Sequence, residues 1–220
     1  MRFRITAAVL SLTCAACVVT AGGAGAAKVK YRAYQSKSGG YILTIPASWQ
    51  LVPRSQAGVK ALAARYAKSK KTAALGKAYA AILASPGGRA AITSYDFQAF
   101  AWPADPATPI PTQVSLGIKK YSRVITKKDL PALGATQANA FKSTSGTQVS
   151  SVKQLQLPAG PAVGVQAAIP AGGGIYVGAL VIIIPHGKRV YTLAFQIDAR
   201  YLEQATLFPA IAKALSLKPL

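Results

Sequence analysis

Residues 182–195 have the sequence Ile182-Ile183-Ile184-Pro185-His186-Gly187-Lys188-Arg189-Val190-Tyr191-Thr192-Leu193-Ala194-Phe195, and this stretch decides the fold. It consists of two apolar runs around a link that contains proline and glycine. In the second run, large apolar residues alternate with smaller or polar ones, which is the pattern of a strand with one buried face. The stretch therefore predicts a hairpin of two antiparallel strands.

The same pattern continues on the N-terminal side of this hairpin. Four apolar runs follow one another, at residues 149–157, 162–169, 175–184 and 189–197. The links between them carry proline and glycine, so the runs predict an antiparallel meander. The stretch 177–184 is apolar on both faces, and we expect it at the centre of the sheet.

Two predicted helices accompany this sheet. One is expected over 130–141, with Asp129 in the position of its N-cap. The other is amphipathic, follows the meander and must lie on the sheet. It is marked by apolar residues at helical spacing: Phe208, Ile211, Ala212 and Leu215.

The N-terminal part of the chain predicts two more strands and two helices. Strands at 31–36 and 41–45 flank a Ser-Gly-Gly turn, and Trp49 is expected in the core. Residues 58–84 have helical periodicity in two segments, with a bend near 70–72 because the two apolar faces do not align. These faces consist of Val59, Leu62 and Tyr66 in the first segment, and of Leu75, Tyr79 and Ile82 in the second.

The middle of the chain is less regular. Tyr95 and Phe97 alternate with polar residues, which predicts a strand over 91–102. Four prolines in the next nine residues predict a surface loop at 103–111. Residues 114–125 are ambiguous. Together these elements predict one α+β domain over residues 28–220.

Two parts of this pattern resemble the PsbP-like superfamily, whose members include exported actinobacterial proteins of the LpqN and LpqT type. The first is Gly40-Tyr41-Ile42-Leu43-Thr44-Ile45-Pro46-Ala47-Ser48-Trp49. The second is Tyr-x-Leu-x-Phe at 191–195, followed by Phe-x-x-Ile-Ala-x-x-Leu at 208–215. The resemblance implies an α/β/α sandwich around an antiparallel sheet and a non-catalytic binding or accessory role. It implies no site residues, and the proline-rich loop and high basicity depart from it.

The first 27 residues have the three-part layout of a signal peptide: a basic start, an apolar run at 5–19 and a small-x-small site at 24–26. The apolar run has about 15 residues, fewer than the roughly 20 that a membrane-spanning helix needs. We therefore expect an extracytoplasmic protein, secreted or associated with the cell surface. A lipid anchor at Cys17 is the alternative, although Cys14 departs from the aliphatic residue that a lipobox has there.

Positive charge is the second strong feature of the chain. The sequence has 26 Lys and Arg against 5 Asp and Glu, a formal net charge of +21, and only Arg2 and Arg4 leave with the leader. Such a field attracts polyanions, although a basic surface can also be merely solvated. We expect one basic face built from two segments. Its candidate residues are Lys60, Arg65, Lys68 and Lys71, together with Lys119, Lys120, Arg123, Lys127 and Lys128.

The chain offers little for catalysis or for metal binding. Outside the leader it has one histidine, His186, and no cysteine, so it lacks the ligands of a zinc site. The five carboxylates form no cluster suited to calcium. Ser150-Ser151-Val152-Lys153 matches S-x-x-K but lies in a predicted strand, where the motif has no catalytic context. We therefore expect no enzyme activity and no cofactor.

These observations favour an exported, non-enzymatic accessory or binding module of the cell envelope. Its expected partner is an anionic component, either lipid headgroups or an acidic wall polymer, and not a specific nucleic acid. No membrane span is expected after the leader, because prolines interrupt the uncharged stretch between Lys153 and Lys188. Two alternatives stay open: a hydrolase that uses His186 or Glu203, and an assembly protein that offers its proline-rich loop as a peptide ligand.

Overall fold

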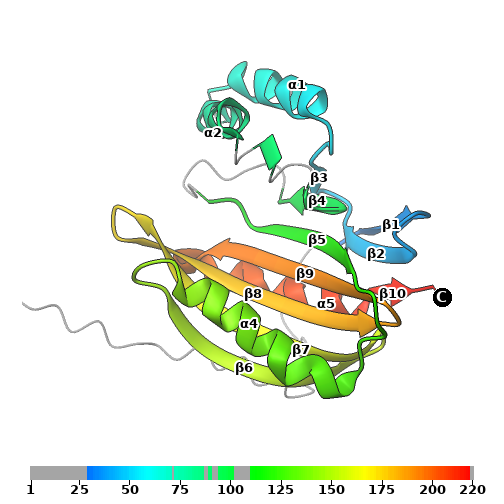
Figure 1. Cartoon of the computed structure of the whole chain (residues 1–220). Coiled ribbons are helices and arrows are strands. Elements are labelled where there is room, and N and C mark those ends of the chain that lie inside the picture. Colours follow the sequence, from blue (N-terminus) through cyan, green and yellow to red (C-terminus); the bar gives the residue numbers. More distant parts are fainter. Residues whose placement is uncertain (1–28, 71, 87–88, 91–93, 102–109, 219–220) are drawn as a thin grey trace, which may run out of the picture.

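The computed structural model describes residues 29–70, 72–86, 89–90, 94–101 and 110–218 (Figure 1). The predicted signal peptide, Cys17 and residues 103–109 of the proline-rich loop lie outside the described residues. Among the described residues, no helix is both long and apolar enough to cross a membrane.

Two antiparallel sheets form the centre of the molecule. The larger has seven strands in the order β3-β4-β5-β9-β8-β7-β6. Their bounds are Gln50–Leu51, Phe97–Phe100, Gln113–Lys120, Arg189–Asp198, Ile175–His186, Gly160–Gly172 and Gln148–Leu157, in that order. The smaller sheet has the order β1-β2-β10, with bounds Tyr31–Ser36, Tyr41–Pro46 and Ser216–Leu217. The predicted meander is therefore confirmed as β6 to β9.

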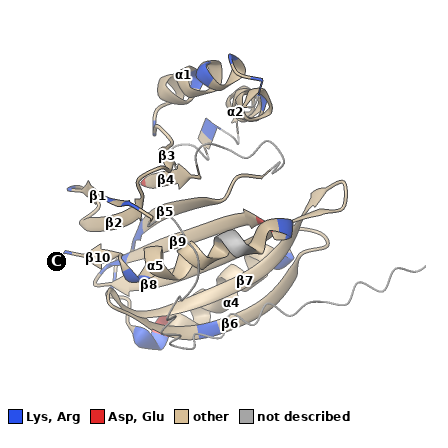
Figure 2. Cartoon of the chain, turned by 180° about the vertical axis from the view of Figure 1, so that it is seen from behind, with Lys and Arg blue, Asp and Glu red and all other residues tan. Residues whose placement is uncertain are grey.

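Helices cover both faces of the large sheet. Helix α4, Leu130–Lys142, lies on one face (Figure 1), and α5, Leu207–Lys213, lies on the other (Figure 2). A 3-10 segment, Ala199–Thr206, leads from β9 into α5. The antiparallel sheets flanked by helices confirm the α+β class and the amphipathic C-terminal helix.

The main core lies between the large sheet and α5. Phe195 of β9 stacks on Phe208 of α5, with 4.6 Å between the ring centroids. Leu43 and Ile45 of β2 are fully buried in the same core, and so is Trp49, at 3% exposure. This burial confirms Trp49 as a core residue and ties the small sheet to the large one.

A second core lies under α4. Leu130 is fully buried there against Val163, Val181 and Ile183, which come from β7 and β8. Gly134 allows this close approach, because a Cβ at that position would lie 2.9 Å from a Val163 methyl carbon.

The third core belongs to a helical hairpin made of α1, Gln56–Ala67, and α2, Ala73–Ala84. Tyr66 and Tyr79 pack on Phe100 of β4, with ring centroids 6.0 and 6.2 Å from it. The hairpin confirms the two predicted helical segments and the break between them. In Figure 1 it stands beyond the β3–β4 edge of the large sheet.

One residue of the hairpin was misplaced by the sequence pattern. Ile82 was expected on the inner face of α2, but it is 39% exposed, and Leu83 packs on the core instead. The reason is Gly76, where a Cβ would lie 2.8 Å from the backbone nitrogen of Ala67. Gly76 must therefore face α1, which sets the rotation of the whole helix.

Two further predictions need correction. The strand expected over 91–102 is only β4, because Ala90 and Ser94 on either side of the undescribed residues 91–93 are helical. Asp129 occupies the N-cap position of α4, but its side chain makes no cap hydrogen bond there. Its carboxylate instead accepts the backbone N–H of Thr126 at 2.8 Å, in a capping box whose cap residue is Thr126. The ambiguous segment 114–125 contributes to β5 up to Lys120. The short strands β3 and β10 were not expected.

Candidate anion-binding surface

Four segments that are distant in the sequence meet at one end of the large sheet. They are the β1–β2 turn, the end of β5 with the loop after it, the β8–β9 turn, and the residue after β10. In the sheet, Lys120 lies opposite Arg189. The backbone N–H of Lys218 donates to the Gly40 carbonyl at 2.9 Å.

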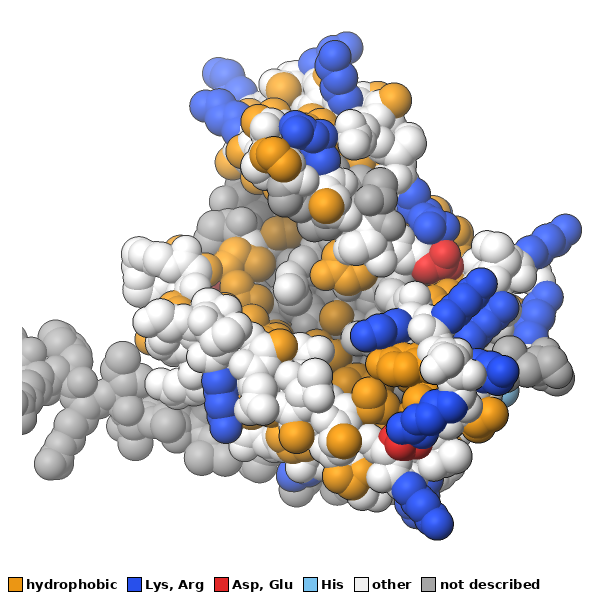
Figure 3. All heavy atoms as spheres, in the orientation of Figure 1, with side chains coloured by type: hydrophobic (Ala, Val, Ile, Leu, Met, Phe, Trp, Pro, Cys, Tyr) orange, Lys and Arg blue, Asp and Glu red, His pale blue; other side chains and the backbone are white. Residues whose placement is uncertain are grey.

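We call this surface the basic end, because each of these segments brings cations to it. Its residues are Lys37, Lys119, Lys120, Arg123, Lys127, Lys128, Lys188, Arg189 and Lys218. All but the partly buried Arg189 are exposed. In Figure 3, basic side chains gather along the side of the molecule where β5 ends.

The β1–β2 turn is held to β9 from within the basic end. Arg189 Nη1 donates to the Gly39 carbonyl at 3.1 Å, and the Tyr191 hydroxyl donates to the same carbonyl at 2.8 Å. His186 Nε2 donates to the Lys218 carbonyl at 2.9 Å, so this ring nitrogen carries a proton. Arg189 and His186 therefore act as structural ties, and the lysines are the free cations of the surface.

The loop after β5 is tied to the β8–β9 turn in the same way. The backbone N–H of Tyr121 donates to the Lys188 carbonyl at 2.8 Å, and that of Ile125 donates to the Gly187 carbonyl at 2.9 Å. The Ile125 side chain is buried under α4, at 5% exposure. These contacts hold the cations of the loop on a defined backbone.

One carboxylate lies within the basic end. Asp129 accepts from both terminal nitrogens of the Arg123 guanidinium, from Nη2 at 2.6 Å and from Nη1 at 3.2 Å. The Arg123 guanidinium, helped by the Thr126 N–H, holds the pKa of Asp129 well below its usual range. Asp129 therefore stays charged and offsets Arg123.

The other carboxylates whose side chains the structure describes are also engaged by arginines. Arg54 binds Asp96 at 2.9 Å, and Arg200 binds the fully buried Asp198 at 2.8 Å. The Arg200 contact lowers the pKa of Asp198. No described carboxylate is therefore available to neutralise Lys119, Lys120, Lys127 or Lys128.

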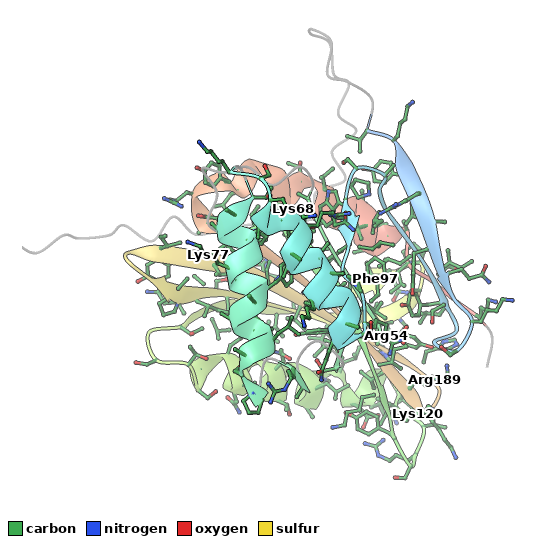
Figure 4. The ribbon with its side chains drawn as sticks, turned by 90° about the horizontal axis from the view of Figure 1, so that it is seen from above. Arg54, Lys68, Lys77, Phe97, Lys120 and Arg189 are labelled. Carbon is green, nitrogen blue, oxygen red and sulfur yellow. The ribbon has the colours of Figure 1, made fainter. Side chains whose placement is uncertain are left out.

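The cations predicted on the first helix lie on α1, in the helical hairpin, and not at the basic end. Lys60, Arg65 and Lys68 are exposed there, and Lys71 lies outside the described residues. Arg65 donates to the Gln50 side chain at 2.7 Å and lies over the Tyr66 ring. Seen from above, Arg54 lies between Lys68 and Lys120 (Figure 4). The two predicted segments thus occupy separate elements.

A solvent-open depression of about 440 Å³ adjoins this hairpin. It is lined by Gln56, Ala57, Lys60, Leu83 and Arg89. Arg89 is engaged by the carbonyls of Leu83 and Ala84 at 2.9 and 3.2 Å, so it closes the end of α2.

Among the side chains that the structure describes, the groups weighed for catalysis do not come together. His186 lies at the end of β8, and the Ser150 and Ser151 hydroxyls donate to Gln166 on the neighbouring strand. The Glu203 side chain lies outside the described residues. Burial, with the nearby Asp96 carboxylate, raises the pKa of Tyr41 far above its usual value, so this phenol stays neutral. Within the described chain, no three His, Cys, Asp or Glu residues form a metal site.

Sequence reasoning found the cations of the loop after β5 but missed four others. Lys37, Lys188, Arg189 and Lys218 lie far from that loop in the sequence and reach it only through strand pairing. The one available sign was Lys188-Arg189 in the predicted hairpin turn.

Comparison with known proteins shows the fold alone. The sequence matches no protein-family model and no curated protein. The structure is similar to cyanobacterial PsbP (CyanoP) from Synechocystis, with a TM-score of 0.54 and 12% identity over 90% of this chain and 98% of that one. The fold is therefore PsbP-like.

Two further solved structures share less of the arrangement. A protein from Bacteroides thetaiotaomicron has a TM-score of 0.46 and 7% identity over 84% of this chain and 48% of its own. The Saccharomyces cerevisiae Ran-binding protein Mog1p has a TM-score of 0.47 and 6% identity over 87% of this chain and 97% of its own.

Proposed function

We propose that this chain is an exported, non-enzymatic binding module whose basic end contacts an anionic component of the cell envelope. The observation that carries the proposal is the convergence, on one end of the sheet, of lysines from several segments that no described carboxylate neutralises. The PsbP-like fold suits such an accessory role, and the predicted leader supports a location outside the cytoplasm. As part of this proposal, the chain is related to the exported actinobacterial proteins of the LpqN and LpqT type that its sequence resembles.

Electrostatics gives the expected size of the interaction. A lysine near an anionic membrane surface contributes about 1 kcal/mol, and salt weakens all such contacts together. Removing four lysines at the basic end should therefore weaken binding by about a thousandfold. If the basic end were merely solvated surface, removing its lysines would weaken binding no more than removing lysines elsewhere on the protein.

Retention on surfaces of known charge tests this proposal. The purified protein is sedimented with phosphatidylcholine vesicles, with vesicles that also contain phosphatidylglycerol, and with resin-bound polyphosphate, each at low and moderate salt. We expect retention on both anionic surfaces that falls as salt rises. Equal retention on neutral and anionic surfaces would overturn the proposal.

The matching variant reverses four charges: Lys119→Glu, Lys120→Glu, Lys127→Glu and Lys128→Glu together. All four side chains are exposed, so we expect an unchanged circular dichroism spectrum and melting curve. We expect retention on both anionic surfaces to be lost. If a folded variant still binds them like the original protein, the basic end is only solvated surface.

A further inference from the structure

The most exposed large apolar side chain in the described part of the chain lies within the basic end. Val124 is 53% exposed, more than Val152 at 47% or Val29 at 46%. Its neighbours in the sequence are Arg123 and the buried Ile125. A single exposed valine is ordinary on a protein surface, so its position must carry the argument.

The backbone around Val124 is fixed. The hydrogen bonds from Tyr121 and Ile125 to the β8–β9 turn hold both ends of the short loop 121–125. Arg123 Nη1 also donates to the Val124 carbonyl, at 3.2 Å. Because Ile125 is anchored in the core beneath α4, the loop presents Val124 outward without any rearrangement. A partner would therefore meet an ordered surface and pay little ordering entropy.

Cations surround this apolar tip. Lys119 and Lys120 precede the loop, Lys127 and Lys128 follow it, and Lys188 lies in the turn to which it is tied. The half-buried Tyr121 adds an aromatic ring, and Lys119 Nζ lies 5.1 Å from its centroid. The apolar Val124, the amphipathic Tyr121 and the surrounding lysines are complementary to the surface of an anionic bilayer. Acyl chains take up apolar groups there, and phosphates bind the cations.

We propose that the loop 121–125 inserts Val124 at the headgroup–acyl boundary of an anionic lipid bilayer, while the surrounding lysines bind lipid phosphates. This inference rests on the proposed function and names the lipid surface as the anionic partner. A soluble acidic polymer offers the lysines the same charges but gives Val124 no apolar layer. The side chain of residue 124 therefore distinguishes the two partners.

Tryptophan fluorescence at position 124 tests the insertion. In the Val124→Trp variant we expect a blue shift and quenching by brominated acyl chains on phosphatidylglycerol vesicles, but no such change with polyphosphate. The signal of the original protein, which contains Trp49 and Trp102, is subtracted. The matched control is Val152→Trp on β6, which is similarly exposed but outside the basic end and should show no change. A bound Val124→Trp variant with unshifted, unquenched emission would overturn the insertion.

Affinity gives a second measurement. Val124→Ser should weaken binding to anionic vesicles about fivefold, because the smaller, polar serine transfers less apolar surface from water into the bilayer. Its binding to polyphosphate should not change, and Val152→Ser should change neither. If the original protein binds no anionic surface at all, the proposed function fails. If it binds vesicles but the Val124 variants behave like their controls, only the lipid insertion fails.

Discussion

The basic end and the helical hairpin both expose lysines, but they hold them differently. On the hairpin, Lys60 and Lys77 lie on two helices that bury Val59 and Tyr79 on their inner sides. Lys68 and Lys70 lie in the turn between these helices. At the basic end, the lysines come from segments that are tied together by hydrogen bonds and strand pairing. The hairpin therefore exposes cations because its helices are amphipathic, whereas the basic end brings cations from distant segments together through tertiary contacts. Local charge density alone does not distinguish these two cases.

The largest expected effect concerns the main core between α5 and the large sheet, the same sheet that carries the basic end. Phe195→Ala removes a fully buried ring that stacks on Phe208. We expect the free energy of unfolding to fall by about 4 kcal/mol, measured by urea denaturation. Vesicle binding should be lost at the urea concentration where the sheet unfolds. A loss below about 1 kcal/mol would contradict the assignment of Phe195 to the main core.

A smaller effect is expected in the hairpin. Leu62→Ala opens a cavity in the small core of α1 and α2, where Leu62 is 5% exposed. We expect a local loss of about 3 kcal/mol, seen as faster amide hydrogen exchange over residues 56–84. Binding to anionic vesicles should be unchanged, because the basic end does not depend on that core. If binding fell together with hairpin protection, the two regions would act as one unit.

The stability of the protein should depend on pH through one carboxylate at the basic end, Asp129, and one in the sheet, Asp198. The folded-state pKa values of Asp129 and Asp198 are lowered by Arg123 and Arg200. A lowered pKa contributes stability above the unfolded value of about 4, and this contribution is lost as the pH falls through the folded value. We therefore expect the free energy of unfolding to decrease from neutral pH to about pH 3.

Two single variants separate these contributions. Asp198→Asn and Asp129→Asn should each flatten the decrease of unfolding free energy with acid. Asp198→Asn should also cost more stability at neutral pH, because it leaves the buried side chain with weaker contacts to Arg200. An unchanged pH dependence in both variants would show that other groups cause the acid response.

Local patterns predicted those parts of the fold that contact their neighbours in sequence. The meander β6 to β9, the two hairpin helices and α5 each follow from periodicity and from proline- or glycine-bearing links. The features that were missed depend on distant partners. The rotation of α2 is set by Gly76 against α1, and the short strand β10 exists only because it pairs with β2.

The candidate surface was predicted in part for the same reason. Lys119 to Lys128 form a local cluster that is visible in the sequence. Lys37 joins it through the bond from Arg189 to Gly39, 150 residues away in the sequence. Lys188 joins it through the backbone hydrogen bonds from Tyr121 and Ile125 to the β8–β9 turn. The Thr126 side chain, and not that of Asp129, caps the turn before α4. The sequence did not predict this, because the residue types alone do not specify which oxygen accepts which N–H.

The most direct test compares two variants that have the same total charge. One carries Lys119→Glu, Lys120→Glu, Lys127→Glu and Lys128→Glu at the basic end, and the other carries Lys60→Glu, Lys68→Glu, Lys70→Glu and Lys77→Glu on the hairpin. Their dissociation constants for phosphatidylglycerol-containing vesicles are measured at one salt concentration, after unchanged circular dichroism has been established. We predict a loss of more than about a thousandfold for the first variant, because reversal adds repulsion to the lost attraction, and of less than about tenfold for the second. Equal losses would show that only total charge matters and would contradict the assignment of binding to the basic end.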